Sequence, residues 1–169
     1  LLNRNIKVVG VSRSGSDILC DLTDENQITE ILHSEKYDAV INAAAQVNIN
    51  RCEKRPLESW KINARLVSIL ANFCNDSAVP LLHISTDHFF NYGDHYPHKE
   101  NDPVFCVNEY ARHKFAAEGF ALACSGSLVL RTSFLGARKK GQKNIINWAI
   151  DSLLRKDQIE LFGDAWTSS

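Results

Sequence analysis

Short apolar runs alternate along the chain with longer stretches in which apolar residues recur at helical spacing. The runs are almost continuously hydrophobic, which is typical of parallel strands that are covered on both faces. We expect strands at 6–11, 17–20, 38–44, 80–85, 127–131 and 158–162. We expect amphipathic helices at 25–34, 56–75, 109–123 and 144–154, the first capped by Thr23 or Asp24. This alternation predicts a doubly wound α/β fold, with a parallel sheet, right-handed crossovers and helices on both faces.

The composition gives no sign of an unusual partner. The 169 residues are 44% hydrophobic and 23% charged, which is ordinary for a globular protein in solution. A net charge of -1 favours neither nucleic acid nor a membrane as a partner. Five cysteines without a Cys-x-x-Cys pair favour reduced thiols and a cytoplasmic location. The histidine-rich segment from His88 to His98 is interpreted as a hydrated loop, so no metal is expected.

Tyr110 and Lys114 are the first candidates for chemistry. They lie four residues apart in a predicted helix and therefore share one of its faces. A cation beside a phenol lowers a pKa that is ordinarily about 10, which makes the tyrosine usable as a general acid or base. A hydroxyl at the end of the preceding strand, from Thr86 or Ser85, can bind the same substrate oxygen. Chance supplies such a pair in roughly a quarter of similar chains, but this strand and helix context favours a carbonyl/alcohol redox site.

Small and polar residues gather where the predicted strands end. In a doubly wound sheet, ligands bind outside these carboxyl ends. Ala43 and Ala44 would let a flat ligand approach the backbone, although packing under a helix explains them equally well. The first strand is followed by Arg13, with no acid before Asp17. This pattern favours NADP over NAD, since a carboxylate at this point usually binds the NAD ribose; the alternative is that Arg13 is a solvated turn residue.

Together these residues resemble the extended short-chain dehydrogenase/reductase family, and within it the dTDP-4-dehydrorhamnose reductase (RmlD-like) branch. The motifs that carry the resemblance are Cys20-Asp21-Leu22, Val40-Ile41-Asn42-Ala43-Ala44-Ala45, Cys52-Glu53 with Asn63, Ile84-Ser85-Thr86-Asp87, Tyr110-x-x-x-Lys114 and Leu130-Arg131-Thr132-Ser133-Phe134-Leu135-Gly136. Their order and spacing match over almost the whole chain. The resemblance implies an NAD(P)-binding Rossmann fold that acts on a nucleotide-linked sugar.

The resemblance also implies roles for individual residues. Thr86, Tyr110 and Lys114 would be catalytic: Tyr110 would protonate the C4 carbonyl oxygen of a keto-sugar while the nicotinamide delivers hydride. Lys114 would lower the tyrosine pKa and bind the nicotinamide ribose, and Thr86 would orient the carbonyl. The expected cofactor contacts are Arg13, Asp21, Leu22, Asn42, Ala43, Ala44, Tyr110 and Lys114. The expected substrate contacts are Thr86, Asp87, Tyr110, Phe134 and Asn144.

Within these sets, Asp21 and Leu22 would contact adenine, and Asn42 to Ala44 would line the cofactor groove. Phe134 would lie against the sugar, and Asn144 near the nucleotide phosphates. The expected partner is therefore a nucleotide-sugar substrate, with a homodimer as a candidate assembly.

The chain departs from the resemblance at both ends. The first strand and glycine-rich turn of the family are missing, and that strand would lie between the runs at 6–11 and 38–44. We therefore expect residues 1–157 to form a partial NAD(P)-binding domain and 158–169 to begin a truncated substrate-binding lobe. His88 and Asn50 stand where the branch often has Tyr and Asp, so the resemblance points to the family more specifically than to dTDP-4-dehydrorhamnose as the substrate.

Two alternatives to a reductase stay open. A sugar-nucleotide epimerase or dehydratase would use the same three catalytic residues for transient oxidation, although Asp87-His88 lacks the Glu that usually follows in dehydratases. The third reading is a non-catalytic regulatory subunit that resembles the methionine adenosyltransferase β subunit. The intact Thr86, Tyr110 and Lys114 favour an enzyme, whereas the missing glycine-rich turn favours a regulatory role.

Overall fold

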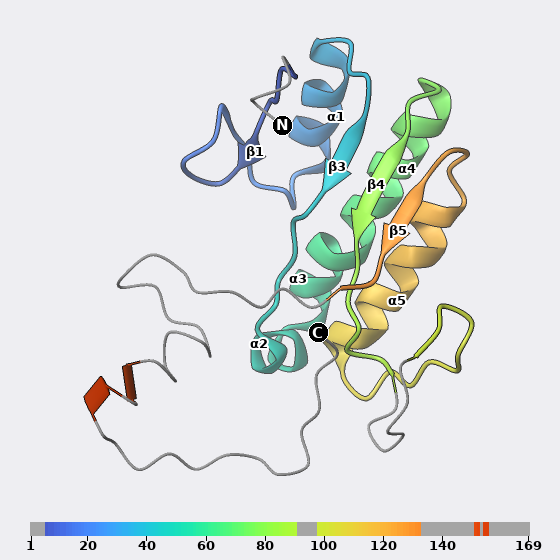
Figure 1. The fold of residues 1–169 in the computed structure, drawn as a ribbon. Helices are drawn as coiled ribbons and strands as arrows, with labels where there is room; N and C mark the ends of the chain where they lie inside the picture. Colours follow the sequence, from blue (N-terminus) through green and yellow to red (C-terminus); the bar gives the residue numbers. More distant parts are fainter. Residues whose placement is uncertain (1–5, 91–97, 133–150, 153, 156–169) are drawn as a thin grey trace.

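Two parallel sheets form the framework of the molecule (Figure 1). The computed structural model describes residues 6–90, 98–132, 151–152 and 154–155. The smaller sheet contains β1 (Val11–Ser12) and β2 (Ile18–Leu19), and the larger contains β3 (Val40–Asn42), β4 (Leu81–Ile84) and β5 (Leu128–Leu130) in that order. Every strand pair is parallel. The predicted α/β fold with parallel strands is therefore confirmed.

The strands are shorter than the apolar runs that predicted them. The run at 6–11 contributes only its last residue to β1, so the predicted bounds of that strand are wrong. Among the described residues, no strand pairs with both β1 and β3, which lie in separate sheets. Within the part of the chain that the structure describes, β1 pairs with β2 only and β3 pairs with β4 only. The strand predicted at 158–162 and the domain boundary predicted near residue 157 lie outside the described residues.

The helices follow the sequence pattern more closely than the strands do. They are α1 (Glu25–Ser34), α2 (Ile49–Lys54), α3 (Pro56–Trp60), the π-helical segment η2 (Lys61–Arg65), α4 (Leu66–Asp76) and α5 (Glu109–Leu122). α1 confirms its predicted range, and α5 ends one residue before its predicted end. The helix predicted at 56–75 is built from α3, η2 and α4. The short helix α2 was not predicted, since six residues are too few to show a helical period.

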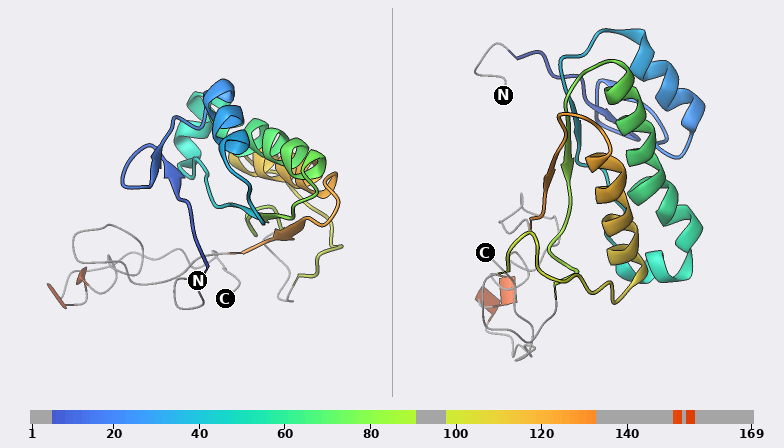
Figure 2. Two further views of the ribbon diagram at one scale, coloured as in Figure 1. Left: turned by 90° about the horizontal axis from the view of Figure 1, so that it is seen from above. Right: turned by 90° about the vertical axis from the view of Figure 1, so that its right-hand side faces the viewer.

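The described helices cover one face of the larger sheet. α1, α4 and α5 lie side by side in one layer (Figure 2). Along β4, Leu81 and His83 point into this layer and are buried, whereas Leu128 and Leu130 of the neighbouring β5 are exposed. The prediction that helices cover both faces is thus not met by the described residues, and most of the helix predicted at 144–154 lies outside them.

The hydrophobic core lies between this helix layer and the sheet. Its buried members are Cys20, Ile28, Leu32, Leu66, Val67, Leu70, Ala71, Cys74, Leu81, Ala117, Ala121 and Cys124. All five cysteines are free thiols. No helix in the described part of the chain is long and apolar enough to cross a membrane.

Asp24 caps the N-terminus of α1, as predicted. Its side chain accepts hydrogen bonds from the backbone N–H groups of Asn26 and Gln27, each at 3.1 Å. Replacing Asp24 with Ala is expected to lower the free energy of unfolding by about 1 kcal/mol, because these N–H groups lose their acceptor. Urea denaturation measures the loss. The control is Glu30→Ala, which removes an exposed carboxylate from the middle of the same helix; equal losses in both variants would contradict the capping role.

Candidate active site

The predicted catalytic residues converge at the carboxyl end of β4. Thr86 lies two residues beyond this strand, and Tyr110 and Lys114 lie one turn apart near the start of α5. The α5 N-terminus is held by Asn108, whose side chain accepts a hydrogen bond from the Ala111 N–H at 2.8 Å. All three predicted residues are buried, and the Thr86 hydroxyl lies near enough to Tyr110 to affect the pKa of its phenol. The structure therefore brings together residues that are 28 positions apart, from Thr86 to Lys114.

Lys114 is turned toward β4. Its Nζ donates a hydrogen bond to the Ile84 carbonyl oxygen at 2.6 Å and lies 3.2 Å from Nε2 of His83. The side chain is only 2% exposed. Burial lowers the Lys114 pKa to about 8, and the negative charge of Glu118 opposes this shift only in part. At pH 7 roughly a tenth of Lys114 is therefore a neutral amine, and the share reaches about half near pH 8.

Tyr110 has a raised pKa, so the prediction that Lys114 lowers it is wrong for this structure. Burial of the phenol is the main cause, and the charges of Cys52 and Asp87 raise the pKa further, against the hydrogen bond with Thr86. Lys114 does not lower it because its nitrogen binds Ile84 and His83 instead. At neutral pH the phenol keeps its proton, which suits a group that must give a proton to an oxygen atom.

Ser85 and Thr86 supply two buried hydroxyls just beyond β4, and that of Thr86 lies near Tyr110. Thr86 Oγ1 accepts a hydrogen bond from the His88 N–H at 3.2 Å. The His88 ring meets the Tyr110 ring edge to face, with centroids 6.0 Å apart. Ser85 Oγ is buried and has no hydrogen-bond partner among the described residues. An unpaired buried hydroxyl is costly, so this atom is available to a ligand that enters beside Thr86.

Asn42 does not face an open groove. Its Oδ1 accepts a hydrogen bond from the Ala44 N–H at 3.1 Å, and its Nδ2 lies 3.1 Å from Nδ1 of His83. Ala43 is exposed and Ala44 is partly buried, so small side chains flank Asn42 at the end of β3. The predicted cofactor contacts of these three residues stay a prediction. His83 was missed by the sequence analysis, although a histidine within an otherwise apolar strand was a signal for it.

The residues predicted to contact adenine lie beyond β1 and β2. Asp21 accepts hydrogen bonds from the N–H and the hydroxyl of Thr23, which lower the pKa of its carboxyl group. Leu22 packs against the core, and Arg13 is exposed between β1 and β2. The predicted substrate contacts Phe134 and Asn144 lie outside the described residues.

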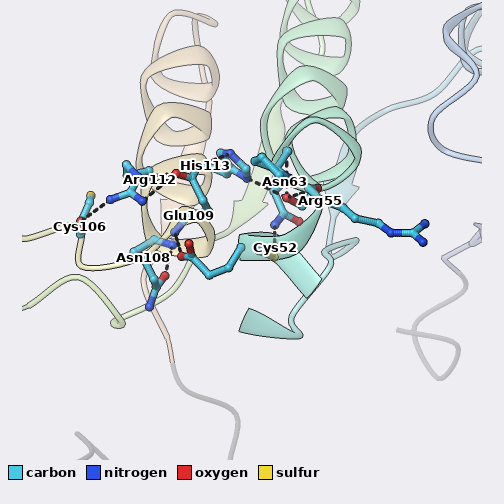
Figure 3. Close-up of polar contacts among 12 residues, drawn as sticks. Cys52, Arg55, Asn63, Cys106, Asn108, Glu109, Arg112 and His113 are labelled. Atoms are coloured by element: carbon cyan, nitrogen blue, oxygen red, sulfur yellow. Dashed lines mark hydrogen bonds and ion pairs between the residues drawn. The ribbon is translucent and has the colours of Figure 1, made fainter. Parts of the chain in front are cut away.

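A second polar network fixes the N-terminus of α5 (Figure 3). Glu109 binds Arg112 at 2.7 Å and Nε2 of His113 at 3.1 Å, and its backbone N–H donates to Glu53 Oε1 at 2.7 Å. Nδ1 of His113 lies 3.3 Å from Ser59 Oγ on α3. These contacts join α2, α3 and α5, and so hold the turn that carries Tyr110.

Asn63 and Cys52, two of the residues that carry the family resemblance, hold the backbone at Gln46. Asn63 lies in η2, where its Oδ1 accepts from the Gln46 N–H at 2.7 Å and its Nδ2 donates to the Gln46 carbonyl at 3.1 Å. The Cys52 thiol donates to the same carbonyl at 3.3 Å. Asn63 and Cys52 therefore shape the chain that leaves β3, rather than presenting reactive groups to solvent.

Neither a metal cluster among the described residues nor the hollow beside α2 coincides with this site. Within the described ranges, no group of three or more His, Cys, Asp and Glu side chains could hold a metal ion. A surface hollow of about 470 Å³ lies beside α2, lined by Asn48, Asn50, Arg51, Lys54 and Arg55. It contains none of the predicted site residues, so the buried cluster around Tyr110 is the stronger candidate.

Comparison with known proteins agrees with this geometry. Residues 1–168 match the family described as the RmlD substrate binding domain. Over 125 residues the chain is 30% identical to the dTDP-4-dehydrorhamnose reductase of Escherichia coli K12, covering 73% of this chain and 42% of that protein. Over 148 residues it is 29% identical to the probable low-salt glycan biosynthesis reductase Agl14 of Haloferax volcanii, covering 85% and 49%.

A solved structure supports the fold. The crystal structure of a hypothetical dTDP-4-dehydrorhamnose reductase from Sulfolobus tokodaii superposes with a TM-score of 0.68 at 30% identity, covering 77% of this chain and 48% of that one. The chain spans about half the length of the relatives it matches. The predicted family is confirmed: the chain belongs to the RmlD substrate binding domain family.

Proposed function

We propose that the protein is an NAD(P)-dependent reductase of the 4-keto group of a nucleotide-linked sugar. The observation that carries this proposal is the buried Tyr110, with the Thr86 hydroxyl near its phenol and a buried Lys114 one turn later. Relatives that are named dTDP-4-dehydrorhamnose reductases support the same substrate class.

The residues at the sheet edge fit a nicotinamide cofactor. Ser85 offers an unpaired buried hydroxyl, and the small side chains of Ala43 and Ala44 leave the backbone approachable. Lys114 has hydrogens that could bind ribose hydroxyls once it leaves the Ile84 carbonyl. When bound, the cofactor would supply hydride to C4 of the sugar.

The proton for this reduction would come from Tyr110. Its raised pKa keeps the phenol protonated at neutral pH, so the hydroxyl can donate to the C4 carbonyl oxygen. As hydride reaches the carbon, the carbonyl oxygen becomes more basic and takes the phenol proton. The Thr86 hydroxyl would hold the same oxygen in line, which limits the number of orientations that the sugar can adopt.

Turnover by the full-length protein tests this function. Purified protein is mixed with NADPH and a dTDP-linked 4-keto-6-deoxy sugar, and the absorbance of the reduced nicotinamide is followed. We expect its oxidation to depend on both sugar and protein. Sugar interconversion without net oxidation would instead indicate an epimerase. A protein that changes neither compound, but forms a stable complex with another protein, would indicate a regulatory subunit.

NADP is proposed as the preferred cofactor, because Arg13 is exposed where the adenosine ribose of the cofactor would lie. Arg13→Ala is expected to raise the KM for NADPH about tenfold and to change the KM for NADH little, since only NADPH carries a 2′-phosphate. Steady-state kinetics with both cofactors measure this difference. Lys36→Ala removes an exposed cation next to α1 and serves as the control; an equal effect on both cofactors would contradict the role of Arg13.

A further inference from the structure

His83 is a buried polar residue for which the proposed reaction has no role so far. Its side chain is fully buried within β4. Both ring nitrogens nevertheless have a polar neighbour: Nδ1 lies 3.1 Å from Asn42 Nδ2, and Nε2 lies 3.2 Å from Lys114 Nζ. The ring thus connects β3 to the lysine of the candidate active site.

The positions of the hydrogens in this chain of contacts follow from one fixed donor. The backbone nitrogen of Ala44 can only donate, so the Asn42 atom that faces it at 3.1 Å must be the oxygen Oδ1. The other end of the amide, Nδ2, then donates to His83 Nδ1. A neutral imidazole carries one hydrogen, so His83 must carry it on Nε2.

That hydrogen points at Lys114. An ammonium group has three hydrogens and no lone pair, so it cannot accept a hydrogen bond from Nε2. A neutral amine can accept it, and can still donate to the Ile84 carbonyl at 2.6 Å. The contact between Nε2 and Nζ is therefore a hydrogen bond only when Lys114 is an amine.

Burial favours the neutral form of both groups, and for Lys114 the amine predominates above about pH 8. Burial, followed by the charge of Lys114, lowers the His83 pKa to about 3, so the ring is neutral at ordinary pH. Burial lowers the Lys114 pKa to about 8. Glu118 acts in the opposite direction on Lys114, but its carboxylate is paired with Arg131 at 2.7 Å.

We propose that His83 is a positioning residue that donates a hydrogen bond to the neutral amine of Lys114 and holds this amine against β4. Asn42 sets the required tautomer. The inference deepens the proposed reductase function, and its kinetic consequence rests on that function, whereas its spectroscopic consequences do not. Lys114 would reach a ligand hydroxyl as an amine, able to accept a hydrogen bond as well as to donate one.

The tautomer is tested first, by ¹⁵N NMR of the full-length protein labelled at histidine. The His83 signals are assigned by their loss in His83→Gln. We expect Nε2 to be protonated and Nδ1 unprotonated above the Lys114 pKa of about 8, where the lysine is mainly an amine. The reverse tautomer would overturn the proposal, because Nε2 would then accept a hydrogen bond from an ammonium.

The charge state of Lys114 is tested by titrating its ¹³Cε signal, assigned with Lys114→Arg. His83→Phe removes the donor. We expect the midpoint pH of the Lys114 titration to rise by about one unit, which is a roughly tenfold lower proton concentration. His83→Gln retains an N–H near the position of Nε2, and we expect a midpoint close to that of the wild type. A midpoint that falls in His83→Phe would overturn the proposal, since an ammonium would then have lost an acceptor. His33→Gln, at an exposed position of α1, is the control for loss of a histidine.

Kinetics separate a positioning role from a merely structural one. In His83→Phe, we expect the limb of the kcat/KM profile that follows Lys114 to move with the NMR midpoint, and His83→Gln to restore it. A profile that does not move while the midpoint does would overturn the positioning role. A wild-type protein without reductase activity would refute the proposed function and leave the two NMR tests decisive for His83.

Discussion

Replacing Tyr110 with Phe is expected to lower kcat/KM for the keto-sugar by about 10² to 10⁴, the usual contribution of a general acid. The substitution removes one oxygen atom and keeps the ring. Because the Tyr110 ring is buried against His88, the fold should tolerate the change, and the effect should fall on the chemical step. Steady-state kinetics with NADPH measure it.

A matched control lies elsewhere in the chain. Tyr37 also donates its hydroxyl, to the Ile31 carbonyl at 3.0 Å, but it lies at the end of α1, apart from the candidate site. Tyr37→Phe is expected to leave kcat/KM unchanged within about twofold. For comparison, each tenfold loss corresponds to about 1.4 kcal/mol of transition-state stabilisation. If Tyr110→Phe loses no more activity than this control, Tyr110 is not the proton donor.

Replacing Glu118 with Ala is expected to destabilise the protein by about 3–5 kcal/mol, the cost of leaving one charge of a buried ion pair without its partner. The side chains of Glu118 and Arg131 are 4% and 18% exposed. Arg131 Nη2 lies 2.7 Å from Oε2 and Nε lies 3.1 Å from Oε1, so the pair is bidentate. Urea denaturation, followed by circular dichroism, measures the loss of unfolding free energy.

The pair matters because Arg131 holds several segments at once. Its Nη1 donates to the Glu100 carbonyl at 3.0 Å, and its guanidinium lies over the rings of Phe89 and Phe90, 4.9 and 5.3 Å from their centroids. Phe89 and Phe90 lie three and four positions after Thr86, in the segment that follows β4. Loss of Glu118 is therefore expected to loosen the loop that carries the candidate site.

Two further variants make this prediction specific. Glu25 and Arg65 form an ion pair of the same bidentate geometry, at 2.7 and 2.9 Å, but both side chains are nearly half exposed. Glu25→Ala is expected to cost several-fold less, because water screens exposed charges. The double variant Glu118→Ala/Arg131→Met is expected to recover part of the lost stability, since no unpaired charge remains. Equal losses at Glu118 and Glu25 would show that burial does not strengthen the first pair.

The local features of the fold could be predicted from the sequence. α1 begins after Asp24 because the Asp24 side chain accepts hydrogen bonds from the free N–H groups two and three residues later, and such contacts need only neighbouring residues. The pairing of Tyr110 with Lys114 on one face of α5 likewise follows from the pitch of a helix. The alternation of apolar runs and amphipathic stretches predicted the parallel strands, because a helix between two strands acts as the crossover that parallel pairing requires.

The chemical state of the site was decided by tertiary contacts. The sequence predicted a cation that lowers the Tyr110 pKa, but in the structure Lys114 binds Ile84 and His83, and burial raises that pKa instead. The bounds of β1 also depended on which strand pairs with it. Helical periods and caps are determined by residues within a few positions of one another, so the sequence by itself determined them. Burial, pKa values and buried hydrogen bonds depend on side chains that only the folded chain brings together, and the tertiary structure alone decided those.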